Sequence, residues 1–174
     1  MPVLFSKTAW RNLCVIFVVL LALFAFPQTV QAAPFVAIDV YYYALDGVGE
    51  PCFVTERFEV HGRLADDEQA MMRVRFANLL ENLAPSQTVG IPQGTRLLGV
   101  WRDHDTLFLN VSREILDYGG AANGRLLRGQ LLRNAAEVYG AACLVVLVEG
   151  AEVVWPEGLR MSWIPIRADA EGGW

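Results

Sequence analysis

The hydrophobic and polar positions of the chain follow two different periods, and the change of period separates predicted strands from predicted helices. Five segments show the alternating or continuously apolar pattern of β-strands, with turn-forming residues between them. They comprise residues 36–44, 52–60, 96–102, 106–111 and 143–148. Residues 149–150 are expected to turn the fifth strand into residues 151–155. Residues 162–166 contain a proline and are expected to form a short closing strand at a sheet edge.

Two other segments show the spacing of helices. The first is expected to begin at Asp66, which forms a capping pair with Gln69 three residues later. Its apolar stripe consists of Met72, Phe76, Leu79, Leu80 and Leu83. The second covers residues 125–139 and is expected to stop at Gly140. Its stripe consists of Leu127, Leu131, Ala135 and Val138. Stripes of this kind face a protein core far more often than a ligand.

This order of elements predicts an α+β fold. We expect two helices packed on one face of a mixed, mostly antiparallel β-sheet of four to six strands, in a single domain. The continuously apolar segment 143–148 is expected to be buried on both faces, because such a strand has no polar face. Residues 33–174 are predicted to form this domain, with a core that spans about residues 36–166.

Residues 1–32 have the pattern of a secretory signal peptide. Lys7 and Arg11 precede an uninterrupted apolar run at residues 13–26, and small or tolerated residues precede Ala33 as at a cleavage site. The run is shorter than the roughly 20 residues that a membrane span needs. We therefore expect an exported, extracytoplasmic protein of the cell envelope or the medium, with this segment either cleaved or retained as an anchor.

The charge balance argues against two classes of partner. The full chain has a formal net charge of −5, and Lys7 and Arg11 are the only charged residues of the signal segment. The remaining residues therefore carry 12 basic and 19 acidic side chains, a net charge of −7. An acidic surface without basic clusters disfavours nucleic acid and anionic lipids. A membrane contact is expected only through an uncleaved signal segment.

Cysteine and histidine are sparse. Cys52 and Cys143 lie in predicted strands, where they are either buried free thiols or, because export permits it, a disulfide. His61 follows a strand, and His104 lies in an Asp-His-Asp turn. No spacing of Cys or His resembles a metal site. We therefore predict no metal and no cofactor.

Other candidates for chemistry have simpler structural explanations. The carboxylates of Glu56 and Glu59 belong on strand faces, and those of Asp66 and Asp67 suit the positive end of a helix. Tyr41, Tyr42 and Tyr43 form an aromatic run on the first strand, and we favour packing at a strand rim over a binding platform. The sequence therefore predicts no catalytic or cofactor-binding residues.

Several short sequence motifs, taken in their order along the chain, indicate a family resemblance. Residues 91–98 read Ile-Pro-Gln-Gly-Thr-Arg-Leu-Leu, residues 109–112 read Leu-Asn-Val-Ser, and residues 148–150 read Val-Glu-Gly. Together with the strand that contains the tyrosine run, they resemble the GerM (sporulation and spore germination, GerMN) domain over about residues 38–165. The resemblance implies a non-enzymatic extracytoplasmic module, related to the small ring-building domains of envelope and spore-septum machines.

Three functions are compatible with these features. The first is a protein-interaction module, with other envelope or spore-septum proteins as partners and self-association left open. The second is a small exported hydrolase that uses Cys143 or a carboxylate pair, which requires a reactive environment for that thiol. The third is a small-ligand-binding domain at the tyrosine run, which requires a concave apolar pocket there. We favour the interaction module.

Overall fold

The computed structural model describes residues 35–83 and 88–166, and the predicted signal peptide lies outside this part of the chain. The described strands are β1 (Phe35–Leu45), β2 (Pro51–His61), β3 (Leu97–Asp103), β4 (Thr106–Val111), β5 (Cys143–Val148) and β6 (Ile164–Pro165). The α-helices are α2 (Glu68–Ala77) and α3 (Ala121–Ala136). Short helical turns lie at Gly62–Asp66, Asn78–Asn82, Arg113–Leu116 and Pro156–Gly158.

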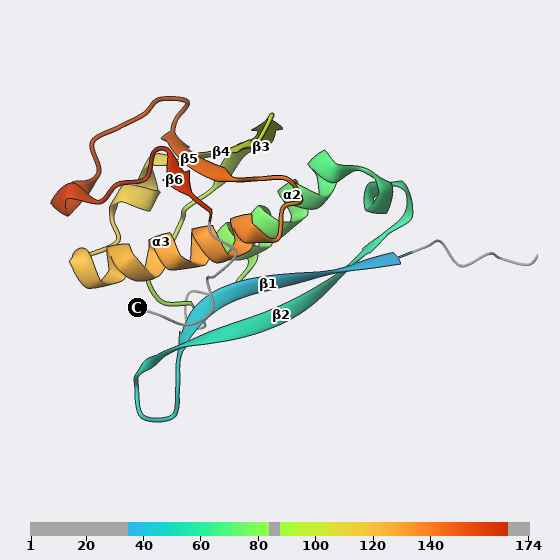
Figure 1. Cartoon of the computed structure of the whole chain (residues 1–174). Helices are drawn as coiled ribbons and strands as arrows, with labels where there is room; N and C mark the ends of the chain where they lie inside the picture. The colour runs from blue at the N-terminus through green and yellow to red at the C-terminus, as the bar shows by residue number, and fades with distance from the viewer. Residues whose placement is uncertain (1–34, 84–87, 167–174) are drawn as a thin grey trace, which may run out of the picture. The chain divides into compact units, whose positions relative to one another are not determined.

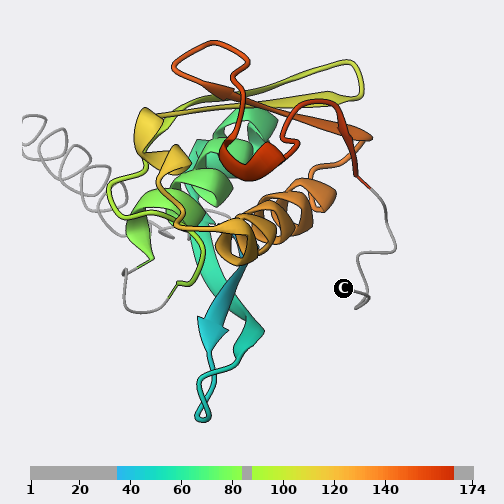
Figure 2. The same cartoon turned by 90° about the vertical axis from the view of Figure 1, so that its left-hand side faces the viewer.

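The strands form two separate sheets. β1 and β2 pair as a long antiparallel hairpin, whereas the other four strands form a sheet in the order β3-β4-β5-β6. Within that sheet only β4 and β5 run parallel. The helices lie between the hairpin and the four-stranded sheet (Figures 1 and 2). The predicted α+β class with mixed, mostly antiparallel pairing is confirmed, but the prediction of one sheet is wrong.

One core joins the three layers. Fully buried side chains come from the hairpin, from both helices and from the four-stranded sheet, and they belong to one cluster. Both predicted helix stripes lie in that cluster, as the spacing of their apolar residues indicates. Residues Pro34–Trp174 form one compact unit, which contains all the core residues that the structure describes.

The helix boundaries differ from the sequence prediction by a few residues. The N-cap of α2 is Asp67 and not Asp66, because the Asp67 carboxylate accepts from the backbone N–H groups of Gln69 and Ala70. Adjacent aspartates offer the same chemistry, so the sequence does not distinguish them. The second helix, α3, begins at Ala121, earlier than expected, and ends at Ala136 before Gly140.

The C-terminal part of the described chain closes the sheet. Residues 151–155 do not continue as a strand; Ala151 forms only an isolated bridge with Val148. Trp155 is instead buried, and its ring stacks near Tyr118. The expected edge strand within residues 162–166 is present as β6, which pairs with β5. In the described part of the chain, no helix has the length and apolar character needed to cross a membrane.

Candidate functional site

Cys143, the strongest candidate nucleophile, lies half-buried at the start of β5. Burial raises the pKa of its thiol, and the negative charge of Asp105 raises it further. A reactive cysteine needs the opposite environment, because the thiolate is the nucleophile and nearby positive charge stabilises it. Cys52 and Cys143 are both free and belong to different sheets. The position of Cys143 therefore does not favour nucleophilic catalysis.

This environment predicts slow alkylation of Cys143. In a Cys52→Ser variant of residues 34–174, iodoacetamide should react more slowly with the folded protein than with the urea-unfolded protein near pH 8. The reason is that an unfolded thiol ionises near its usual pKa of about 8.5, whereas the folded thiol ionises only at higher pH. The raised pKa also makes stability depend on pH: its contribution is fully present below the pKa of the unfolded thiol and is lost as pH rises through the pKa of the folded one. Equal alkylation rates would contradict the assignment.

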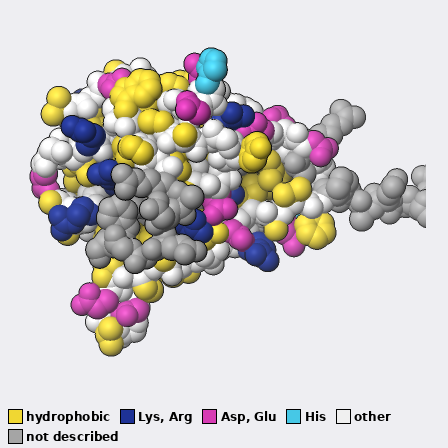
Figure 3. Space-filling model, in the orientation of Figure 1, with side chains coloured by type: hydrophobic (Ala, Val, Ile, Leu, Met, Phe, Trp, Pro, Cys, Tyr) yellow, Lys and Arg dark blue, Asp and Glu magenta, His cyan; other side chains and the backbone are white. Residues whose placement is uncertain are grey.

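Both histidines lie on the surface, and each has a carboxylate of a nearby residue beside it. His61 lies 3.5 Å from Glu59 on β2, and His104 Nδ1 lies 2.8 Å from Asp103 Oδ1 in the β3–β4 turn. Figure 3 shows one histidine side chain projecting from the surface beside acidic groups. Among the described residues, no group of three or more His, Cys, Asp or Glu side chains could hold a metal ion.

The tyrosine run is divided between the two faces of β1. Tyr42 is buried in the core. The Arg133 guanidinium lies 4.1 Å from the centroid of the Tyr41 ring, and the Tyr43 ring lies 3.9 Å from that of Phe53 on the neighbouring strand. Contacts within the protein therefore account for all three rings, as the preferred sequence interpretation held.

The outer edge of β1 is occupied by polar side chains from the helices. Asn134 Oδ1 accepts from the Tyr41 N–H at 3.1 Å, and Asn134 Nδ2 donates to the Tyr41 carbonyl at 2.6 Å. Gln130 Oε1 accepts from the Tyr43 N–H at 3.0 Å. The Tyr43 carbonyl accepts from the Val89 N–H, and Arg75 donates to the carbonyl of Asp39. Side chains thus take the place of a neighbouring strand.

α2 and the helical turn that follows it make similar contacts with β3. Gln69 Nε2 donates to the Val100 carbonyl at 2.5 Å, and the Leu97 N–H donates to Glu81 Oε1 at 2.6 Å. At the opposite margin of this sheet, β6 is short and contains Pro165, which lacks an N–H. Helix side chains or proline therefore limit strand addition at these edges.

The outer face of the four-stranded sheet carries exposed aromatic rings. Trp101 on β3 and Phe108 on β4 are paired across the strands, and their rings stack with a centroid distance of 5.2 Å. Trp163 meets Phe108 edge-on at 6.4 Å. Trp101 is 37% exposed and Trp163 is 59% exposed. Both described helices lie on the opposite side of this sheet (Figure 2). We call Trp101, Phe108 and Trp163 the outer aromatic row.

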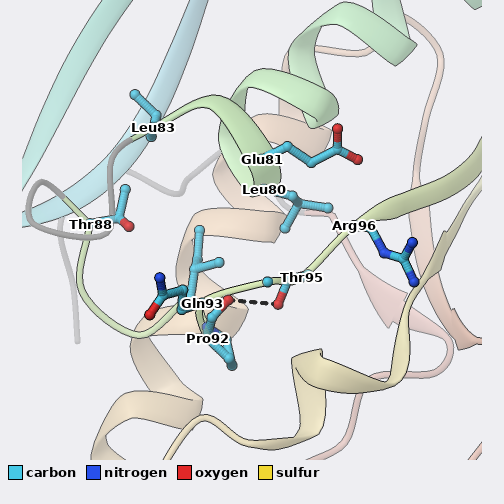
Figure 4. Close-up of a pocket in the computed structure, with 10 residues that line it drawn as sticks. Leu80, Glu81, Leu83, Thr88, Pro92, Gln93, Thr95 and Arg96 are labelled. Carbon is cyan, nitrogen blue, oxygen red and sulfur yellow. Dashed lines mark hydrogen bonds between the residues drawn. The ribbon is translucent and has the colours of Figure 1, made fainter.

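A shallow cavity lies where the Ile-Pro-Gln-Gly-Thr phrase passes the end of the first helical region. It has a volume of about 260 Å³, and residues 91–96 line it together with Leu80, Glu81, Leu83 and Thr88. Thr95 Oγ1 donates to the Pro92 carbonyl at 2.8 Å, which fixes the turn (Figure 4). In Figure 4 the charged ends of Glu81 and Arg96 lie to one side, away from Thr88 and Gln93. The segment 91–95 therefore has a structural role: its turn leads the chain into β3.

The sequence of this chain was compared with models of known protein families, and one family matches. The model of the family described as Germane, sporulation and spore germination, matches residues 39–154. The chain belongs to the Germane family. The predicted resemblance to GerM domains is thereby confirmed, and the matched region extends from β1 to the segment after β5.

Two solved structures show that the fold of this Germane chain is shared with GerM. The first GerMN domain of the sporulation protein GerM from Bacillus subtilis is 14% identical, with a TM-score of 0.51, and the match covers 76% of this chain and 98% of that one. The tandem GerMN domains of the same protein give 14% identity and a TM-score of 0.53, with 82% and 49% covered. This chain thus spans about half of the tandem protein. No curated protein matches it in sequence.

The sequence prediction missed the polar residues at the β1 edge. Gln130 and Asn134 are fully buried, although amides on a predicted helix are usually assigned to its solvated face. One signal was available: each directly precedes a residue of the apolar stripe, Leu131 or Ala135, so the pair lies at its margin. Their partners on β1 are about ninety residues away in the chain, and local patterns do not reveal such contacts.

Proposed function

We propose that this Germane domain is an exported, non-enzymatic interaction module that binds another envelope or spore-septum protein through its outer aromatic row. The row formed by Trp101, Phe108 and Trp163 is the observation that carries the proposal. Family membership supports a role in sporulation or germination. The signal-peptide pattern of residues 1–32 supports export to the cell envelope.

The chemistry of the row suits a protein partner. Aromatic side chains are enriched at interfaces and dominate binding energy where water is excluded. Trp101 and Phe108 already stack, so little side-chain entropy remains to be lost on binding. Charged residues lie at its margin, including Asp103 on the same strand, and this matches an apolar centre with a polar rim.

The alternatives have weaker support. The hydrolase hypothesis depends on Cys143, whose thiol is held in its protonated form, or on a carboxylate pair. Asp67 of one such pair is occupied in capping α2, and Glu59 of the other lies beside His61. The ligand-binding hypothesis depends on the tyrosine run, where the rings pack on Arg133 and Phe53 instead.

The proposal predicts that loss of the two exposed tryptophans abolishes capture of the partner. A tagged protein of residues 34–174 would be used in pull-downs from envelope extract, with Trp101→Ser/Trp163→Ser compared with wild type. We expect at least about a tenfold loss of captured partner, as for truncation of interface hot spots. The bound proteins would be quantified by mass spectrometry.

The matched control is Tyr139→Ser/Val154→Ser. These side chains are 92% and 95% exposed, more than either tryptophan, but they lie outside the aromatic row. The control should capture the partner as wild type does. Thermal unfolding of each variant would verify that the fold is retained. Equal capture by the tryptophan variant and the control would contradict the proposed surface.

A further inference from the structure

β2 is the long strand whose outer edge has no partner among the residues that the structure describes. It extends over Pro51–His61 and pairs with β1 on one side only. In Figure 1, β1 lies between β2 and the helices, and β2 forms the margin of the molecule. The edges of β1 and β3 differ from it, because helix side chains form hydrogen bonds with backbone groups at both of those edges.

The register of the hairpin identifies the unpaired groups. On β1, the backbone groups of Asp39, Tyr41 and Tyr43 point away from β2, toward the helices. Residues directly opposite each other in an antiparallel pair point either toward or away from the partner strand together. Their partners Arg57, Thr55 and Phe53 therefore direct N–H and C=O groups outward. By the same alternation, so does Glu59.

We propose that two copies of this chain pair through their β2 edges, antiparallel and about a two-fold axis, with Arg57 of each copy opposite Glu59 of the other. The two hairpins then form one continuous sheet in the order β1-β2-β2-β1. This surface is separate from the outer aromatic row, so the inference goes beyond the proposed function and does not depend on it. Strand addition of this kind obtains its affinity from main-chain hydrogen bonds.

Charge complementarity selects the occupant and the register. The exposed face of β2 carries one basic and one acidic side chain next to each other in the alternation, Arg57 and Glu59. A two-fold axis at Phe58 places each arginine opposite the glutamate of the other copy. An axis at Arg57 or at Glu59 places like charges opposite each other, which is unfavourable. With an axis nearer to Thr55, Arg57 and Glu59 both face uncharged residues of the other copy.

The favoured register also extends an ion pair that is present within one copy. Arg57 Nε lies 2.8 Å from Asp39 Oδ1, and the Arg57 side chain is still 69% exposed. The Glu59 side chain is 59% exposed and lies 3.5 Å from His61. In the pair, Arg57 would lie between Asp39 of its own copy and Glu59 of the other. Glu59 of each copy then gains a guanidinium neighbour, while Asp39 keeps its contact with Arg57.

The test uses two charge reversals that are each repulsive alone and attractive together. Arg57→Glu gives a copy with two acidic side chains at the contact, and Glu59→Arg gives a copy with two basic ones. In residues 34–174, each variant alone should dimerise at least about tenfold more weakly than wild type, since two opposed pairs become like-charged. Mixing the two variants should restore a heterodimer, because every contact then joins an arginine to a glutamate.

Sedimentation velocity over a concentration series would give the dissociation constants, and native mass spectrometry of the mixture would identify the heterodimer by mass. The matched controls are Arg73→Glu and Glu152→Arg, which reverse exposed charges away from β2 and should dimerise as wild type does. The proposal is overturned if wild type remains monomeric, if the single variants dimerise as well as wild type, or if their mixture forms no heterodimer.

Discussion

Replacing Phe76 by alanine should lower the free energy of unfolding by roughly 3–5 kcal/mol. Phe76 lies on α2 with 0% exposure, in the cluster to which the hairpin, the helices and the four-stranded sheet all contribute. A helix in the middle layer has packed elements on both sides, so the cavity left by the ring cannot be filled by one element moving inward. The cost therefore includes a cavity term in addition to the lost transfer free energy.

Urea denaturation of residues 34–174, monitored by far-ultraviolet circular dichroism, would measure the loss. The melting temperature should fall by roughly 10–20 °C for a domain of this size. Asp103→Asn in the β3–β4 turn is the control; this side chain is exposed, and the change should cost about 0.5 kcal/mol or less. Comparable losses in both variants would show that the assignment of Phe76 to the shared core is incorrect.

The strands could be predicted from the sequence because their signal is local. The bounds of β4 and β5 agree with the predicted segments, and those of β1 and β2 differ by one residue at each end. Alternating apolar residues report which face of a strand is buried, and turn residues mark its ends. The same local reasoning identified the buried stripes of both helices.

The grouping of strands into two sheets could not be predicted in this way. Periodicity shows which face of a strand is buried but not which element lies beside its edge. That choice depends here on Gln130 and Asn134, whose amides occupy the backbone groups of β1. With its outer edge occupied, β1 cannot also pair with the four-stranded sheet. The two surfaces proposed for binding, the β2 edge and the outer aromatic row, likewise become visible only once the layers are known.

Replacing Asn134 by leucine should destabilise the domain nearly as much as the change in the core. The Asn134 side chain is fully buried, and its amide satisfies both the N–H and the C=O of Tyr41. Leucine has a similar size but offers no hydrogen bond, so two polar groups of β1 would be left without a partner. Each buried unsatisfied group costs about 1–3 kcal/mol, and the expected loss for the two groups is therefore roughly 2–6 kcal/mol.

Hydrogen exchange separates this explanation from a simple packing defect. If Asn134 replaces a neighbouring strand, Asn134→Leu should remove the protection of the Tyr41 amide, whereas the even-numbered amides of β1 that pair with β2 should remain protected. Asn123→Leu on the same helix is the matched control, since its amide donates to the nearby Gly119 carbonyl at 3.3 Å and not, among the described residues, to β1. An unchanged Tyr41 amide in the Asn134 variant would contradict the role of the Asn134 side chain as a substitute for a neighbouring strand.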